Sequence, residues 1–182
     1  MTLRIAGIAG SLSAPSRTRA LVNLAAQQTQ QRFGGTAETY DLTDLQPYLG
    51  LAGRLDDLAT PQREILDALV SADVLVVGTP VYKGSYTGLF KHLFDLIDPA
   101  ALVGKPVLLT ATGGGDRHAL VIEHQLRPLF GFFEASTVPT GVYAGAMDFI
   151  DGPPASAALL SRLDRAIGQL EPLLQRLLPV AA

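Results

Sequence analysis

The chain has 182 residues, of which 48% are hydrophobic and 17% charged, and this length predicts a single compact domain spanning residues 1–182. A net charge of −3, without long runs of lysine or arginine, argues against nucleic acid or an anionic membrane as the main partner. Because there is no cysteine, disulfides, thiolate catalysis and cysteine-held zinc or iron–sulfur centres are excluded.

The N-terminal residues lead into an apolar strand without a basic segment or a cleavage site. No apolar run approaches the ~18 residues needed to span a membrane. We therefore expect a soluble, cytoplasmic protein.

Apolar runs alternate with helical periodicity along the chain. The apolar runs predict strands at residues 3–9, 36–41, 73–78, 106–110 and 137–143. The amphipathic spacing predicts helices at residues 18–31, 61–72, 89–97, 118–133 and 155–178. This alternation indicates an α/β fold, in which a parallel sheet is covered by helices on both faces. Residues 46–60 and 148–154 are expected to form irregular connections.

The loop at residues 10–18, after the first expected strand, concentrates hydroxyl groups, a cation and backbone amides at the start of a helix. This composition predicts a phosphate site. The loop has neither a G-x-G-x-x-G nor a Walker-type sequence, so a monophosphate is favoured. The alternative is that Ser16 or Thr18 only caps the helix and that the other serines are solvated turn residues.

A second loop, residues 79–88, directly follows the buried strand at residues 73–78. Tyr82 and Tyr86 supply aromatic surface and Lys83 supplies charge, a mixture that suits a flat ligand with polar edges. In the alternative interpretation, both tyrosines are half-buried at the end of the sheet and the lysine is solvated.

A third loop, residues 110–118, contains Gly113, Gly114 and Gly115 in succession. Consecutive glycines permit close approach to a ligand, although a plain turn before the next helix would also use them. The three loops follow strands 1, 3 and 4. In the flavodoxin-like strand order 2-1-3-4-5, these loops surround one crevice at the carboxyl edge of the sheet.

These loops resemble the flavodoxin-like NADPH-dependent FMN reductases, most closely those of two-component alkanesulfonate or methanesulfonate monooxygenase systems. The resemblance covers nearly the whole chain. It is carried by Gly10-Ser11 through Ser16-Arg17-Thr18, by residues 79–88, and by Thr112-Gly113-Gly114 followed by His118-Ala119-Leu120. It implies a three-layer α/β/α fold with a five-stranded parallel sheet in the order 2-1-3-4-5.

The resemblance also implies which residues bind the cofactor. The FMN phosphate would be held by Ser11, Ser13, Ser16, Arg17 and Thr18. The flavin ring would lie against Pro80, Val81, Tyr82 and Lys83, with Gly84 and Ser85 in the same loop, and its polar edge against Thr112, Gly113 and Gly114. Relatives commonly carry arginine at the position of Ser13, so this chain has one phosphate-binding charge fewer.

The expected fourth helix contains His124 four residues before Pro128. Proline has no N–H to donate to the carbonyl of His124, so a local irregularity is predicted, and a π-bulge is one form of it. Reductases of the alkanesulfonate type carry an inserted aromatic residue or histidine here, giving a π-helix at a subunit interface near the flavin. The resemblance implies that His124 is this inserted residue and that it modulates the flavin site. The alternative is that His124 is an ordinary interface or surface histidine beside a proline kink.

His92 and His118 have no matching set of ligands, so no metal site is expected. Hydride transfer between NAD(P)H and a flavin needs no acid–base triad, because the protein only positions the cofactors.

The leading hypothesis is therefore a reductase that oxidises NADPH or NADH and supplies reduced FMN to a flavin-dependent monooxygenase through transient contact. The resemblance suggests sulfonate sulfur acquisition as the setting and a homodimer or homotetramer as the assembly. Three alternatives remain: a reductase that retains FMN and acts on quinones, azo compounds or metal ions, a non-enzymatic flavodoxin-type electron carrier, and a flavin-binding sensor.

Overall fold

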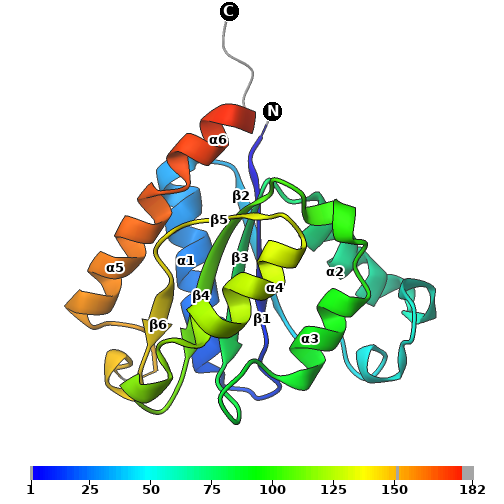
Figure 1. The fold of residues 1–182 in the computed structure, drawn as a ribbon, viewed down its shortest axis with the longest axis horizontal. Helices are drawn as coiled ribbons and strands as arrows, with labels where there is room; N and C mark the ends of the chain where they lie inside the picture. The colour runs from blue at the N-terminus through cyan, green and yellow to red at the C-terminus, as the bar shows by residue number, and fades with distance from the viewer. Residues whose placement is uncertain (1, 151, 178–182) are drawn as a thin grey trace, which may run out of the picture.

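The computed structural model describes residues 2–150 and 152–177, and its helices cover both faces of one sheet (Figure 1). The sheet has six strands in the order β2-β1-β3-β4-β5, and β6 pairs with β4 beyond the end of β5. All of the pairings are parallel. The flavodoxin-like α/β/α fold and the predicted strand order are thus confirmed.

The strands are β1 (Arg4–Ala9), β2 (Thr36–Asp41), β3 (Val74–Pro80), β4 (Pro106–Thr112), β5 (Ser136–Thr137) and β6 (Val142–Ala144). The helices are α1 (Arg17–Phe33), α2 (Thr60–Ser71), α3 (Gly88–Asp95), α4 (Arg127–Phe132), α5 (Ala157–Gly168) and α6 (Glu171–Leu177). A π-helix at Ile122–Leu126 directly precedes α4. Within the described ranges, no helix is both long enough and apolar enough to cross a bilayer.

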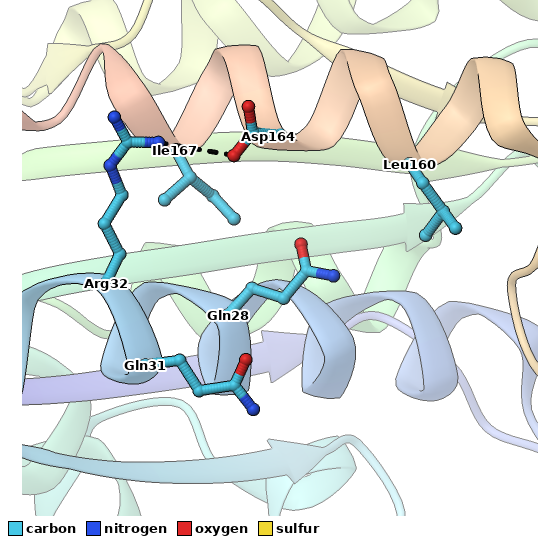
Figure 2. Close-up of a pocket in the computed structure, with 6 residues that line it drawn as sticks. All are labelled: Gln28, Gln31, Arg32, Leu160, Asp164 and Ile167. Atoms are coloured by element: carbon cyan, nitrogen blue, oxygen red, sulfur yellow. Dashed lines mark hydrogen bonds and ion pairs between the residues drawn. The ribbon is translucent and has the colours of Figure 1, made fainter.

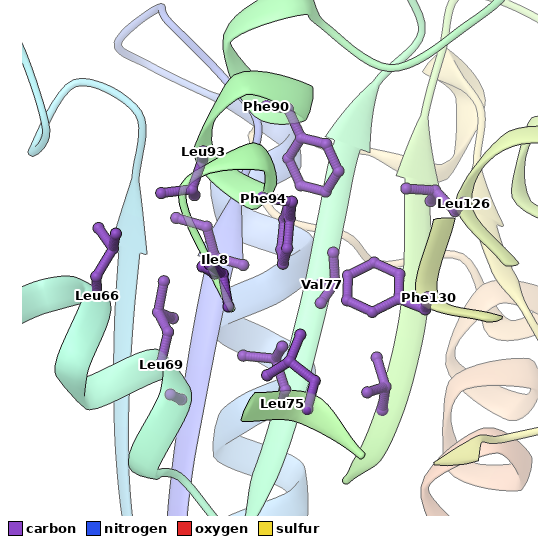
Figure 3. Close-up of a cluster of buried hydrophobic side chains, with 14 of the residues drawn as sticks. Ile8, Leu66, Leu69, Leu75, Val77, Phe90, Leu93, Phe94, Leu126 and Phe130 are labelled. Atoms are coloured by element: carbon purple, nitrogen blue, oxygen red, sulfur yellow. The ribbon is translucent and has the colours of Figure 1, made fainter. Parts of the chain in front are cut away.

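Two hydrophobic cores lie on opposite faces of the sheet, because successive side chains of a strand point in opposite directions. In β1, for example, Ile5 packs on the face covered by α1 and α5, whereas Ile8 packs on the face covered by α2, α3 and α4. Figure 3 shows the second core, where Phe94 of α3 lies between Phe90 and Phe130. Both ring-centroid separations are 4.9 Å, within the range of favourable aromatic contacts.

Two glycines of the sheet lie directly against helix α1. A Cβ atom built on Gly78 of β3 would lie 2.4 Å from Cγ2 of Val22, and one built on Gly7 of β1 would lie 2.8 Å from Cγ1 of the same residue. Glycine at both positions therefore lets α1 rest directly on β1 and β3. This packing places the N-terminus of α1 beside the carboxyl ends of the central strands.

The predicted fifth strand, residues 137–143, is divided into β5 and β6. Pro139 lies between them and has no N–H to donate to a sheet ladder. Val138 still donates its N–H to the carbonyl of Val107, at 2.9 Å, and pairing with β4 resumes at Val142. The prediction of one continuous strand was therefore wrong, although both pieces lie along β4.

The predicted terminal helix, residues 155–178, is divided into α5 and α6. Pro172 cannot donate to the carbonyl of Gly168, and the chain turns between these two residues. Leu163, Ile167 and Leu170 are nevertheless all buried against the sheet across this break. Residue 178 lies outside the described residues.

The connection at residues 46–60 is irregular, as predicted, but it contains two short 3₁₀ turns, Leu49–Leu51 and Leu55–Asp57. It is anchored to α3 by His92, whose Nε2 lies 2.8 Å from the carbonyl oxygen of Ala52. Leu49 is fully buried, although the weak periodicity of the segment gives no sign of this.

Candidate functional site

A cavity of about 320 Å³ opens at the carboxyl edge of the sheet, where β1, β3 and β4 end. Its lining consists of Ser11, Ser13, Pro15, Ser16, Arg17, Thr18, Pro80, Val81, Tyr82, Thr112, Gly113 and Gly114. The three loops that were predicted to surround one crevice therefore do so. Their role in holding FMN stays a prediction at this point.

Three of the predicted site residues, Lys83, Gly84 and Ser85, do not line this cavity. They belong to a tight turn just beyond Tyr82. Pro15, in contrast, lines the cavity but was not among the predicted residues. Its position inside the predicted phosphate loop could have indicated that Pro15 lines the cavity.

The start of α1 presents free backbone donors to the cavity. Ser16 is the N-cap, and its Oγ accepts the N–H of Arg19 at 3.0 Å, so this serine does cap the helix, while it also lines the cavity. Among the described residues, the N–H groups of Arg17 and Thr18 have no acceptor. Such N–H groups lie at the positive end of the helix dipole and favour an anion.

A buried pair of hydroxyl groups lies at the base of the cavity. Oγ1 of Thr18 is 2.7 Å from Oγ1 of Thr112, and the two residues are 2% and 5% exposed. The pair has two hydroxyl hydrogens, and the bond between them uses only one. Within residues 2–150 and 152–177 the other hydrogen has no acceptor, so the site is suited to a ligand that carries acceptor oxygens.

Arg17 contributes a positive charge at the side of the cavity. Its guanidinium carbon lies 5.4 Å from the centroid of the Phe149 ring, a cation–π distance. The structure shows no carboxylate of a described residue within ion-pair distance of it. Phe149 comes from the segment after β6, and sequence reasoning did not connect the two residues.

The turn after β3 is a small hairpin. Tyr82 and Ser85 exchange backbone hydrogen bonds of 2.9 and 3.2 Å, and the two residues between them have positive φ, 54° at Lys83 and 84° at Gly84. This conformation suits glycine but is uncommon for lysine. Tyr82 is 53% exposed, so its ring offers open aromatic surface at the cavity. Tyr86 is half-buried against Phe90, as the alternative interpretation expected for it.

The glycine loop is fastened to β6. Gly113 donates its N–H to the carbonyl of Ala144 at 3.1 Å, and the hydroxyl of Tyr143 donates to the carbonyl of Gly115 at 2.6 Å. A Cβ atom on Gly113 would lie only 2.2 Å from the Tyr143 hydroxyl, so a larger residue there would displace this hydroxyl. Tyr143 was predicted only as part of a strand, because nothing local in the sequence connects it to the loop.

The predicted irregularity before Pro128 is present as the π-helix. The N–H of Arg127 donates to the carbonyl of Ile122, five residues earlier. The π-helix also contacts the hairpin, because Oγ of Ser85 donates to Oε1 of Gln125 at 3.1 Å. The predicted helix over residues 118–133 is therefore not regular, as the missing N–H of Pro128 requires.

His124 lies on the exposed side of the π-helix and lines a groove of about 510 Å³ between α3 and α4. Its predicted role as a modulator of the flavin site is not tested by this position. The other two histidines form local hydrogen bonds. His92 bonds to the carbonyl of Ala52, and His118 bonds to the side chain of Arg117. In the described part of the chain, no cluster of histidine and carboxylate side chains suited to a metal ion occurs.

Arg127 clamps the π-helix to the segment between β5 and β6. Its guanidinium donates to both carboxylate oxygens of Glu123, at 2.6 and 2.9 Å, and to the carbonyl of Val138 at 3.0 Å. The hydrogen bond from Arg127 lowers the pKa of Glu123, and the same contact raises the pKa of Arg127.

A second hollow, of about 500 Å³, lies between α1 and α5 (Figure 2). It is lined by Gln28, Gln31, Arg32, Leu160, Asp164 and Ile167. Arg32 and Asp164 form an exposed ion pair of 3.3 Å across it. None of the three glycine- and hydroxyl-rich loops contributes to this hollow. The candidate binding residues therefore lie at the cavity at the carboxyl edge of the sheet.

Comparison with known proteins places the chain in a family. Residues 3–149 match the family described as NADPH-dependent FMN reductase. The chain belongs to this family. It is 44% identical over 170 residues to the "FMN reductase (NADPH)" of Pseudomonas aeruginosa, with 93% of this chain and 91% of that protein covered.

Two further relatives agree with this assignment. The "NADH-dependent FMN reductase SfnF" of Pseudomonas putida is 42% identical over 182 residues, covering 99% of this chain and 96% of that protein. A solved apo structure named NADH:FMN oxidoreductase (EMOB) superposes with a TM-score of 0.84 at 32% identity, covering 93% of this chain and 90% of the other. The chain is thus an NAD(P)H-dependent FMN reductase, an oxidoreductase with FMN and NADPH or NADH as its cofactors.

The ion pair on the π-helix predicts an acid-sensitive contribution to the stability of this reductase. Because the folded state lowers the pKa of Glu123, the contribution is present above the ordinary value of 4.5 and is lost as the pH falls through the lowered value. We expect the free energy of unfolding to fall more steeply below pH 4.5 in the wild type than in Glu123→Gln. Urea denaturation at a series of pH values measures this.

Glu64→Gln is the matched control, since Glu64 is exposed on α2 and forms no ion pair with another described residue. It should keep the wild-type pH dependence. An identical acid profile for Glu123→Gln and the wild type would contradict the prediction.

Proposed function

We propose that this reductase oxidises NADPH or NADH and releases reduced FMN to a separate flavin-dependent monooxygenase, which it contacts transiently. The observation that carries the binding part of the proposal is the Thr18–Thr112 pair, whose remaining hydroxyl hydrogen needs an acceptor in the cavity. The ribityl chain and phosphate of FMN provide such acceptors. FMN therefore fits the residues that are present.

The phosphate of FMN would bind at the start of α1. Arg17 supplies the positive charge, while the N–H groups of Arg17 and Thr18 and the hydroxyls of the same loop supply hydrogen-bond donors. The Tyr82 ring and the Gly113–Gly114 backbone would hold the flavin ring. When bound, FMN supplies the hydride chemistry, and the protein contributes orientation and exclusion of competing reactions.

Several features favour release of FMN over its permanent retention. Among the described residues that line the cavity, Arg17 is the only one with a cationic side chain. The resemblance of the three loops further implies an arginine in relatives at the position of Ser13. Tyr82 is half-exposed, so one side of the bound ring would remain open. Weak retention is what a reductase needs if reduced FMN must leave for another enzyme.

A setting in sulfonate sulfur metabolism is supported by the resemblance of the three loops to reductases of sulfonate monooxygenase systems. The likeness to SfnF, named an NADH-dependent FMN reductase, supports the same interpretation. We further propose that residues 1–182 form one FMN reductase domain and that the protein acts in the cytoplasm.

We also propose that the protein assembles as a homodimer or homotetramer through the groove beside the π-helix. Pro128, Leu129 and Phe132 of α4 line this groove together with Tyr86 and Phe94 from the other side. Phe132 is 69% exposed in the single chain, and a second copy covering it would remove that apolar surface from water. His124 would then lie at the subunit contact.

Anaerobic stopped-flow reduction of added FMN tests the proposed function. We expect desalted protein to be colourless and to reduce free FMN rapidly with NADPH or NADH. Protein that stays yellow and passes electrons only to quinone-type acceptors would favour the FMN-retaining alternative. Absence of reduction with both nicotinamides would overturn the proposal.

Arg17→Met should weaken FMN binding roughly tenfold to a hundredfold, because a charge-assisted contact to the phosphate contributes about 1.5–3 kcal/mol. Riboflavin, which has no phosphate, should bind both proteins equally. Arg32→Met is the matched control at the far end of the same helix, where Arg32 pairs with Asp164 (Figure 2). Fluorescence titration measures the affinity of all three proteins for FMN and for riboflavin, and equal losses for the two ligands in Arg17→Met would contradict a phosphate role for Arg17.

Phe132→Ser should shift the protein toward monomer in sedimentation velocity, since it removes the most exposed aromatic ring of the groove. Leu51→Ser is the control, because Leu51 is 82% exposed but does not line the groove. Equal oligomeric states for both variants and the wild type would rule out this face as the contact.

A further inference from the structure

The glycine loop of the cavity is supported by one side chain that does not itself line the cavity. Tyr143 of β6 reaches the loop, where its hydroxyl donates to the carbonyl of Gly115 at 2.6 Å and lies 2.2 Å from where a Cβ atom on Gly113 would be. Gly113 is held from its other side by the bond from its N–H to the carbonyl of Ala144. Both ends of the Gly113–Gly115 segment are therefore fixed to β6.

Gly114 lies between these two fixed residues, and its own surroundings are open. A Cβ atom built on it would meet no atom within 4 Å, and its N–H has no acceptor among the described residues. Gly113 and Gly114 both line the cavity. The orientation of this free N–H is therefore determined by the two neighbours that Tyr143 and Ala144 hold.

The surroundings of Tyr143 keep its hydroxyl a donor. Burial, together with the nearby carboxylates of Asp116 and Asp148, raises the pKa of Tyr143. Asp148 is itself held in place by the N–H of Gly145 at 2.8 Å and by the hydroxyl of Ser156. At neutral pH the phenol is therefore protonated and can donate to the Gly115 carbonyl without interruption.

We propose that Tyr143 is a positioning residue that orients the Gly113–Gly115 backbone toward bound FMN and thereby favours its reduced form. The inference rests on the proposed function, because it assumes that FMN occupies this cavity. Reduced FMN has more electron density on its ring than oxidised FMN. A fixed N–H donor therefore binds the reduced form more strongly, and an N–H that has lost its orientation discriminates less.

The test compares Tyr143→Phe with the wild type by measuring the affinity for oxidised FMN and the reduction potential of protein-bound FMN. We expect the preference for reduced over oxidised FMN to fall about tenfold, which for a two-electron couple lowers the potential by about 30 mV. Tyr40→Phe is the matched control: it removes a hydroxyl that bonds Glu38 on β2, outside the cavity. Its potential should equal that of the wild type.

A Tyr143→Phe protein that is less stable but keeps the wild-type potential would overturn the positioning role while leaving the proposed function intact. If the wild type itself binds no FMN, the proposed function fails and this inference fails with it. Should Tyr143→Phe not fold, 3-fluorotyrosine at position 143 gives a second measurement in the otherwise unchanged chain. Its ¹⁹F resonance should shift when bound FMN is reduced, and an unchanged resonance would overturn the proposal.

Discussion

The contact between α1 and the sheet determines where the chemistry of this protein can occur. With glycine at residues 7 and 78, no strand side chain stands against Val22 at these two points, so the helix lies close to β1 and β3 there. The first turn of the helix therefore reaches the end of β4, where Thr18 meets Thr112. A larger residue at either glycine would displace the helix, and the anion-binding end of α1 would move away from the other two loops.

Most of the fold could be predicted from the sequence because its determinants are local. Apolar runs and helical periodicity located the strands and helices, and the fixed handedness of parallel crossovers left few arrangements of them. The cavity followed from the same reasoning, since loops after β1, β3 and β4 must meet at one edge. An irregularity at the position of the π-helix was predictable because the missing N–H of Pro128 affects a carbonyl only four residues away.

What escaped prediction depends on contacts between distant parts of the chain. Tyr143 supports the glycine loop and Phe149 lies against Arg17, but neither relation leaves a pattern in the sequence. The division of the last strand and of the last helix had visible causes in Pro139 and Pro172. The hydrophobic periodicity nevertheless continues across both prolines, because the residues before and after each proline pack into the same core. This continuity hid the breaks.

The hydrogen bond between Ser85 and Gln125 joins the hairpin beside the cavity to the π-helix beside the groove. A coupling free energy between two binding sites is reciprocal. If a protein bound in the groove changes the affinity for flavin by some factor through this bond, bound flavin changes the affinity for that protein by the same factor. If the proposed second copy occupies the groove, a coupling of this kind would make the assembly of the protein depend on the occupancy of the cavity.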